Sequence, residues 1–351
     1  MVHWKKRLNI GWILIIVLIL AAACEEKNPV EQVHQEKEEA PPEVVKIGFS
    51  MDTLEEERWV RDRDLFKKAV EDLGAEVDIM EARGNDALQV LQAETLINQG
   101  IDVLVIVPYN AEAAAAIVQK AHRAGIKVVS YDRLVKNADI DLYVSFDNER
   151  VGELQAKAIK ERVPEGKYVY IGGADTDYNA HLMKKGVFSV LNSSIDNGEI
   201  QVVYDQWTDN WLPENAYINM KEALKANHNH IDAVIAANDA TAGMALKALE
   251  EVGLEGKIPI AGQDAELAAA QRIVQGTQTM TVYKPINTLA REAASLAIAL
   301  AKNEYIDTDK KINNGKIEVP SVLLEPIAVN RDNLDRTIIA DGFHTREDVY
   351  K

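Results

Sequence analysis

Short apolar strands alternate with helical patterns along most of this 351-residue chain, and this alternation limits the folds that it can adopt. Strands separated by helices of about 12 to 18 residues are typical of βαβ units and a parallel sheet. Ten segments fit the strand pattern, at residues 44–49, 77–81, 103–107, 127–131, 143–146, 168–171, 202–204, 233–237, 259–262 and 280–283. Because one doubly wound sheet rarely carries so many strands, the pattern predicts two sheets.

Two pairs of segments resemble each other in the same order, which indicates an internal duplication. Residues 101–107 resemble residues 231–237, and residues 125–133 resemble residues 257–265. Such repetition is typical of a duplicated supersecondary unit, and a chance likeness between valine-rich strands is the alternative. We therefore expect an α/β protein with two similar doubly wound parallel-sheet lobes.

Polar side chains able to bind hydroxyl groups follow six of the strands, and a helical pattern follows each of these strand ends. In open α/β sheets the ligand lies beyond the carboxyl ends of the strands, so these side chains should meet in one crevice. The candidates are Arg58, Trp59, Asp132, Arg133, Asp177, Asn179, Trp211, Asn238, Asp264 and Lys284. Planar Asp, Asn and Arg groups can bond two neighbouring hydroxyls, and indoles can cover ring faces, so the set predicts a site for a small polyol.

Each candidate also has an ordinary structural explanation. Asp132 and Asp264 could cap the helices that follow them, because aspartate is common at that position. Arg58 and Arg133 could be surface ion-pair partners, and Lys284, which precedes a proline, could belong to a hinge. Their joint occurrence at strand ends favours the binding site.

Catalytic and metal-binding signatures are missing from the sequence. No Gly-x-Gly-x-x-Gly follows the first strand, and no phosphate-binding loop, His-Glu-x-x-His or Gly-x-Ser-x-Gly segment is present. The seven histidines are scattered without the spacing of metal ligands. We expect a binding protein that uses no cofactor and no metal, and not an enzyme.

The first 43 residues differ from the rest of the chain. A basic segment at residues 5–7 and an apolar stretch at residues 13–23 predict an export signal at residues 1–23. The only cysteine, Cys24, follows this stretch as in a bacterial lipobox, where the thiol is lipidated; a plain secretory signal is the alternative. Residues 24–43, rich in Glu, Gln and Pro, should form an acidic tether after the lipidated cysteine.

The chain is strongly acidic. Its formal charge of −17 becomes −20 once the three basic residues of the signal are removed. An acidic surface repels phosphate groups, which argues against nucleic acid or anionic lipid as the ligand.

Several segments around the candidate residues are distinctive. They include Glu57-Arg58-Trp59, Tyr131-Asp132-Arg133, Trp211-Leu212-Pro213-Glu214-Asn215, Asn238-Asp239-Ala240-Thr241 and Tyr283-Lys284-Pro285. Together they resemble the D-xylose-binding proteins of bacterial ABC transporters, within the type I periplasmic sugar-binding family, from residue 44 to about residue 344. The resemblance implies a periplasmic binding protein type I fold with a three-stranded hinge. Its N-terminal lobe would be residues 44–148 plus 285–320, and its C-terminal lobe residues 149–284 plus 321–345.

The same resemblance implies how the site would work. The polar candidates would bond the hydroxyls of a pyranose, and Trp59 and Trp211 would sandwich its ring. Tyr178 stands where the familiar members have asparagine, which could reshape the rim of the site.

The resemblance also implies partners. We expect a high-affinity receptor for D-xylose or a related monosaccharide that delivers sugar to an ABC permease. The predicted lipid anchor and tether depart from the free periplasmic members of the family and suit a protein held at the cell membrane, facing outward, on a Gram-positive cell. Two alternatives are a module that reports xylose to a membrane histidine kinase of a two-component system, and the effector domain of a repressor.

Overall fold

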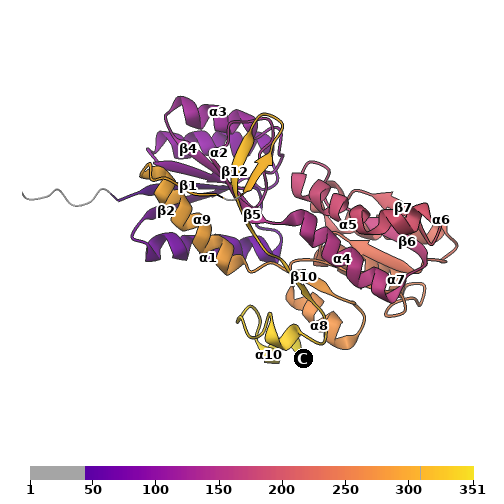
Figure 1. The fold of residues 1–351 in the computed structure, drawn as a ribbon. Coiled ribbons are helices and arrows are strands. Elements are labelled where there is room, and N and C mark those ends of the chain that lie inside the picture. Colours follow the sequence, from indigo (N-terminus) through magenta and orange to yellow (C-terminus); the bar gives the residue numbers. More distant parts are fainter. Residues whose placement is uncertain (1–43, 309) are drawn as a thin grey trace, which may run out of the picture. The chain divides into compact units, whose positions relative to one another are not determined.

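The computed structural model of the protein describes residues 44–308 and 310–351, shown as a ribbon in Figure 1. The predicted export signal, Cys24 and the acidic tether lie outside these residues. Among the helices of the described part, none is long and apolar enough to cross a membrane.

A seven-stranded sheet and the helices packed on it form what we call the first lobe. Its strands follow the order β11-β12-β5-β4-β3-β1-β2, and only β11 runs antiparallel to its neighbour. Its elements are β1 (Lys46–Met51), α1 (Glu57–Asp72), β2 (Glu76–Glu81), α2 (Asp86–Asn98), β3 (Val103–Ile106), α3 (Ala115–Arg123), β4 (Lys127–Tyr131), β5 (Leu142–Phe146), α9 (Ile286–Ala301), β11 (Lys310–Asn313) and β12 (Glu318–Leu324).

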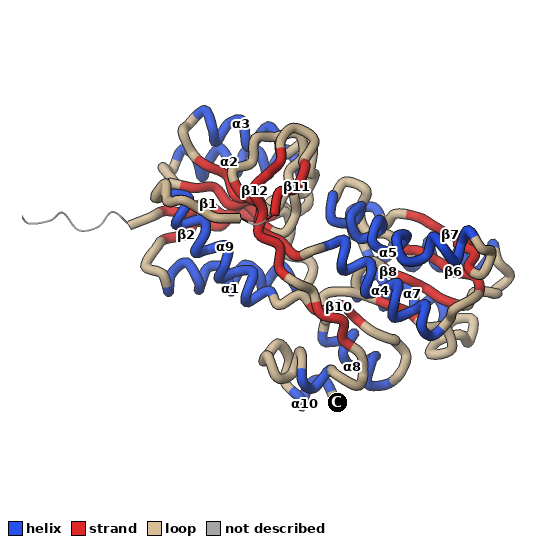
Figure 2. The backbone as a smooth tube through the Cα atoms, viewed as in Figure 1, coloured by secondary structure: helices blue, strands red, loops and turns tan. Residues whose placement is uncertain are grey.

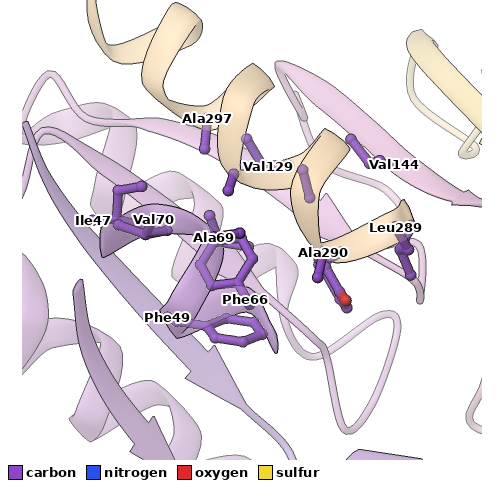
Figure 3. Packing of buried hydrophobic residues seen from close by; sticks show 14 of the residues in the cluster. Ile47, Phe49, Phe66, Ala69, Val70, Val129, Val144, Leu289, Ala290 and Ala297 are labelled. Atoms are coloured by element: carbon purple, nitrogen blue, oxygen red, sulfur yellow. The ribbon is translucent and has the colours of Figure 1, made fainter. Parts of the chain in front are cut away.

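The first lobe has a core on each face of its sheet. Helices α1 and α9, distant in sequence, cover one face together, and Figure 3 shows their side chains meeting there. The rings of Phe49 and Phe66 lie 4.5 Å apart between their centroids in this layer. Helices α2 and α3 bury a second cluster on the other face. Because strands β1, β3 and β4 are covered on both faces, every residue after the first of β1 and β4 is buried, and β3 is both buried and apolar throughout.

A four-stranded parallel sheet in the order β7-β6-β8-β9 is the centre of the second lobe (Figure 2). The lobe also contains a small antiparallel pair, β10-β13. Its elements are α4 (Asn148–Arg162), β6 (Gly166–Ile171), α5 (Tyr178–Asp196), β7 (Ile200–Gln206), the 3-10 turn η1 (Asp209–Trp211), α6 (Pro213–Ala226), β8 (Ala233–Ala236), α7 (Asp239–Glu250), β9 (Ile260–Ala261), α8 (Leu267–Gln275), β10 (Thr281–Tyr283), β13 (Ile327–Val329), η2 (Leu334–Arg336) and α10 (Arg346–Val349).

Two glycines let helices α4 and α5, which lie on one face of the second sheet, pack closely against each other. A Cβ atom on Gly152 would lie 1.9 Å from the carbonyl oxygen of Met183, and one on Gly186 would lie 1.9 Å from that of Glu149. Only glycine fits such an approach of two backbones. The opposite face of the sheet is covered by α6 and α7, which bury a separate cluster.

The internal duplication predicted from the sequence corresponds to equivalent strands. The first pair of similar segments forms β3 and β8, and the second pair forms β4 and β9, which are adjacent in their sheets. The prediction of two similar parallel-sheet lobes is confirmed.

The chain passes between the two lobes at three places, after β5, after β10 and after β12. The third passage follows Leu324. Strand β12 pairs with β5 of the first lobe up to this residue, whose partner is Phe146. The third passage therefore comes later than the boundary expected between residues 320 and 321.

Two other expectations require correction. No helix follows β4, because residues 132–141 form a loop that leads directly into β5. Strands β11, β12 and β13 were not among the ten predicted strands. Strands β12 and β13 pair with β5 and β10, which are distant in the chain and which a local pattern does not register, whereas β11 pairs with the neighbouring β12.

Candidate functional site

All ten side chains predicted for the site line one small cavity between the lobes. Its volume is about 20 Å³, room for about one water molecule. Beside Arg58, Trp59, Asp132, Arg133, Asp177, Asn179, Trp211, Asn238, Asp264 and Lys284, the cavity is lined by Glu56, Asn148, Met183 and Gln263. The strand-end argument thus brought together residues that are up to 226 positions apart, from Arg58 to Lys284.

Arg58 is the centre of an ion network in the first lobe. It lies in the first turn of α1, where its side chain is only 6% exposed. Its Nε donates to Asp62 Oδ2 at 3.0 Å, one helical turn further on, and its Nη2 donates to Asp132 Oδ2. Both carboxylates are buried, so each depends on this guanidinium for charge compensation.

Arg133 forms a second network that reaches both lobes. Its Nη1 donates to Asp52 Oδ2 in the first lobe, and its Nε lies 2.7 Å from Asp177 Oδ2 in the second. Its guanidinium carbon lies 4.9 Å from the centroid of the Trp59 ring, and that of Arg58 lies 4.4 Å from it. Two cations near one indole fix the position of that ring through cation–π attraction.

Asp132 and Asp264 share a backbone conformation that excludes the helix-capping explanation. Their φ angles are 58° and 90°, in the left-handed region that few residues other than glycine adopt. No helix follows Asp132, and the residue at the N-cap of α8 is Glu266. Strained residues of this kind concentrate at ligand sites, and here both direct a carboxylate into the cavity.

Two second-lobe residues reach the site from helix N-termini. Asp177 caps α5 by accepting from the backbone N–H of Asn179 at 2.9 Å, and Asn238 caps α7 with a reciprocal bond to Thr241. Asp177 also accepts from the indole Nε1 of Trp211 at 3.1 Å. Asp177 and Asn238 are therefore helix caps, a role that was not predicted for them, and the same side chains also line the cavity.

Asp264 and Lys284 complete the polar ring of the site. Asp264 Oδ1 lies 3.1 Å from Lys284 Nζ and 3.5 Å from Arg58 Nη1. Across the cavity, the amide nitrogen of Asn179 donates to the carbonyl oxygen and to Oδ1 of Asp132, both at 3.1 Å. Each lobe thus holds polar groups within bonding range of the other.

Burial and charge change the acidity of the carboxyls. Burial alone would raise the pKa of Asp132, but the positive charges of Arg58 and Lys284 outweigh it and lower that pKa. Glu56 is different: burial, aided by Asp264 and Asp52, raises its pKa to about 7 despite Arg133. Burial likewise raises the pKa of Asp52 to about 6. The site therefore contains a firmly ionised carboxylate and two that accept protons readily.

The sequence analysis did not predict four residues that line the cavity, or Asp52 and Asp62, the buried ion-pair partners of Arg133 and Arg58. Glu56 directly precedes helix α1, and Asp62 lies one turn after Arg58, so helical spacing could have identified Asp62 as its partner. Asn148 and Gln263 follow the ends of β5 and β9, so the strand-end pattern could have identified them, whereas Met183, inside α5, carries no comparable signal. No group of three or more potential metal ligands occurs among residues 44–308 and 310–351.

Comparison with known proteins identifies the fold. Residues 47–304 match the family model described as "Periplasmic binding protein domain". The chain is 54% identical over 306 residues to the D-xylose-binding periplasmic protein of Haemophilus influenzae, covering 87% of this chain and 92% of that protein. It is 53% identical over 305 residues to the protein of the same name from Escherichia coli, with the same coverage.

A solved structure agrees with this result. The carbohydrate transporter solute-binding protein of Chloroflexus aurantiacus, in complex with D-glucose, superposes with a TM-score of 0.80 at 31% identity. The match covers 86% of this chain and 97% of that one. The relatives are named as binding proteins and not as enzymes, in agreement with the sequence.

Proposed function

The chain belongs to the periplasmic binding protein family, and we propose that it binds D-xylose, or a closely related monosaccharide, and delivers it to an ABC permease. The observation that carries this proposal is the single cavity lined by all ten predicted residues. Two relatives more than 50% identical to the chain are named D-xylose-binding periplasmic proteins, which supports the choice of sugar.

The contacts around the cavity suit a sugar. A hydroxyl donates to one group and accepts from another, so it can stand between a carboxylate and a cation. Arg58 Nη1 and Asp264 Oδ1 are 3.5 Å apart, a long contact that a hydroxyl from the ligand would replace with two shorter bonds. The indoles of Trp59 and Trp211 supply apolar surface for the ring faces.

Binding requires movement of the lobes. The cavity holds about one water, so a sugar enters only when the lobes separate at the three passages of the chain. A ligand that contacts both lobes then stabilises an arrangement in which the lobes close around it, with a wider cavity than the one in this structure. A permease that contacts both lobes could distinguish the loaded receptor in this way.

Titration calorimetry tests the proposal. We expect D-xylose to bind at least tenfold more tightly than ribose, arabinose, glucose or galactose, because a mismatched hydroxyl leaves a buried group unpaired at a cost of about 1–3 kcal/mol. Tight binding of another sugar alone would overturn the choice of xylose. Binding of none would overturn the receptor function.

We also propose that Cys24 carries a lipid that holds the protein at the outer face of the cell membrane. The support is sequence alone, since this residue follows the apolar segment that ends at residue 23. A Cys24→Ser variant should move from the membrane fraction to the soluble fraction. Unchanged membrane association would contradict lipidation.

Transport and signalling can be separated in cells. If the protein serves the permease, its deletion should abolish high-affinity uptake of labelled xylose. Normal uptake together with lost xylose-dependent transcription would favour the alternative, a partner histidine kinase.

A further inference from the structure

A second, larger cavity adjoins the candidate site. Its volume is about 420 Å³, within the range of about 300–1,000 Å³ typical of small-molecule sites. The two cavities share three lining side chains, those of Glu56, Arg133 and Trp211. A ligand held in the inner cavity could therefore extend past these side chains into the outer one.

The outer cavity has the aromatic and polar groups that sugars require. Tyr109 and Trp211 contribute aromatic surface, and Thr53, Thr176 and Asn210 contribute polar groups. The hydroxyl of Tyr109, from the first lobe, donates to Asn210 Oδ1 of the second lobe at 2.6 Å.

The backbone fixes one of these aromatic rings. Asn210 and Trp211 have φ angles of 57° and 59°, a conformation that asparagine tolerates but that costs free energy at a tryptophan. The Trp211 indole is further held by its bond to Asp177. The indole thus stands between the two cavities in a defined position, where it can contact rings on both sides.

A buried oxygen at this cavity lacks a partner. Asp52 is 1% exposed and lines the outer cavity, and its Oδ2 accepts from Arg133. Its Oδ1 accepts no hydrogen bond of normal geometry from the described residues, although the backbone N–H of Thr53 is near. A buried carboxylate oxygen without a donor is costly, and a ligand hydroxyl in this cavity would supply one once a small movement exposes Oδ1, which is closed off in this structure.

The charges around the outer cavity select against anions. Asp52, Glu55 and Glu57 face Arg83 and Arg133, while Glu56 and Glu266 add less negative charge because burial raises the pKa of both. Hydroxyl groups donate well to carboxylates, whereas an acidic substituent would be repelled.

We propose that the outer cavity is a subsite for a second neutral pyranose ring, so that the protein also binds a xylose disaccharide. This inference rests on the proposed function, because the first ring occupies the inner cavity. It adds a substrate class, a short neutral xylo-oligosaccharide, and assigns Asp52, Tyr109 and Trp211 to its recognition.

The test compares D-xylose with β-1,4-xylobiose by calorimetric titration of the purified full-length protein. We expect xylobiose to bind within about tenfold of the affinity for xylose. An aldobiouronic acid, whose second ring carries a carboxylate, should bind at least tenfold more weakly than xylobiose. Equal binding of these two disaccharides would overturn the assignment of a neutral ring.

A matched pair of variants locates the second ring. Ala240 lines only the outer of the two cavities, as the second residue of α7 after Asn238 and Asp239. Ala87 has the same place in α2, after Asn85 and Asp86, and is exposed. Ala240→Phe should weaken xylobiose binding at least tenfold and leave xylose binding within about threefold, and Ala87→Phe should change neither.

The outcomes separate the two proposals. If xylose binds and xylobiose does not, the outer subsite is wrong and the receptor function stands. If both bind and Ala240→Phe leaves both unchanged, the second ring lies elsewhere and the subsite is overturned. Failure of xylose itself overturns the receptor function.

Discussion

The two lobes hold their halves of the site in different ways. In the first lobe, Arg58 is bonded to Asp62 and Asp132, and Arg133 to Asp52, and all five side chains are less than 9% exposed. These ion pairs lie within one lobe, so they should persist when the lobes separate.

The second lobe relies more on partners outside itself. Asp177 and Asn238 are held by their own helix N-termini, but the cationic partner of Asp177 is Arg133 of the first lobe. The charged partners of Asp264 are Arg58 of the first lobe and Lys284, which lies at a passage between the lobes.

This difference suggests a division of tasks. The first lobe supplies a preorganised surface that a sugar can meet first, and the second lobe supplies groups whose charges are compensated only when the lobes meet. Substitutions in the first network should therefore reduce both stability and binding, whereas those in the second should reduce mainly binding.

The largest expected effect comes from Arg58→Gln. Removing the guanidinium leaves Asp62 buried without its cationic partner and Asp132 with only the more distant charges of Lys284 and Arg133, at a cost of about 3–5 kcal/mol. Thermal unfolding should show a fall in Tm of about 10 °C, and xylose binding should be lost.

Asp177→Asn is the matched change in the second lobe. Asparagine can still cap helix α5, and Arg133 keeps its ion pair with Asp52, so Tm should change by about 2 °C or less. Xylose binding should weaken. Equal losses of Tm in the two variants would refute the division of tasks.

Asp264→Asn should have the next largest effect. Asparagine tolerates the left-handed backbone at this position, so the fold should be retained. The substitution removes the negative charge that Lys284 and Arg58 contact at this position. We therefore expect calorimetry to show at least tenfold weaker xylose binding, with Tm nearly unchanged. Full retention of affinity would exclude Asp264 from the site.

The pH dependence of stability is a smaller effect, and Glu266 of the second lobe is one of the buried acids that contribute to it. Burial, together with Asp239 and Asp264, raises the pKa of Glu266. A carboxyl whose pKa is raised on folding contributes stability below its ordinary pKa near 4 and loses it as the pH rises through the raised value. Glu266→Gln, which mimics the protonated acid, should match the wild-type Tm at pH 4 and exceed it by a few degrees at pH 9.

The control for that experiment is Glu255→Gln, at an exposed acid of the same lobe. Its Tm should follow the wild-type value across the pH range. A constant difference between Glu266→Gln and the wild type at every pH would contradict a titrating Glu266.

The smallest expected effect concerns a contact between the lobes outside the cavity. Lys136 Nζ of the first lobe lies 3.8 Å from the ring centroid of Tyr178, at the start of α5 in the second. Such a contact is worth about 0.5–1 kcal/mol, so Tyr178→Asn should speed xylose release about two- to fivefold in stopped-flow measurements. Tyr178→Phe keeps the ring and should release xylose at the wild-type rate. Release at the wild-type rate from Tyr178→Asn as well would show that the contact does not hold the lobes together.

The ten candidate residues line one cavity, whereas parts of the fold around it were not predicted. Most of the candidates lie together because parallel strands end at a common edge, which ties a local pattern to a place in space. Strand β12 escaped prediction because it contains Pro320 and forms its pairs with β5, far away in sequence.

The loop after β4 shows a different limit. Leu134, Val135 and Ala138 are buried at helical spacing, yet Ser130 and Asn314 hold this segment as a loop. The side chain of Asn314 donates to the carbonyl oxygens of Val135 and Ala138, contacts that no local pattern records. The ion networks beneath the site were missed for the same reason, since Asp52 and Arg133 meet only after folding.

A crystal structure of the protein grown with D-xylose tests the central claim most directly. We predict one pyranose in the inner cavity, bonded to Arg58 and Asp132 of the first lobe and to Asn238 and Asp264 of the second, with Trp59 and Trp211 against its ring. A sugar bound outside this cavity, or contacting one lobe alone, would contradict the account.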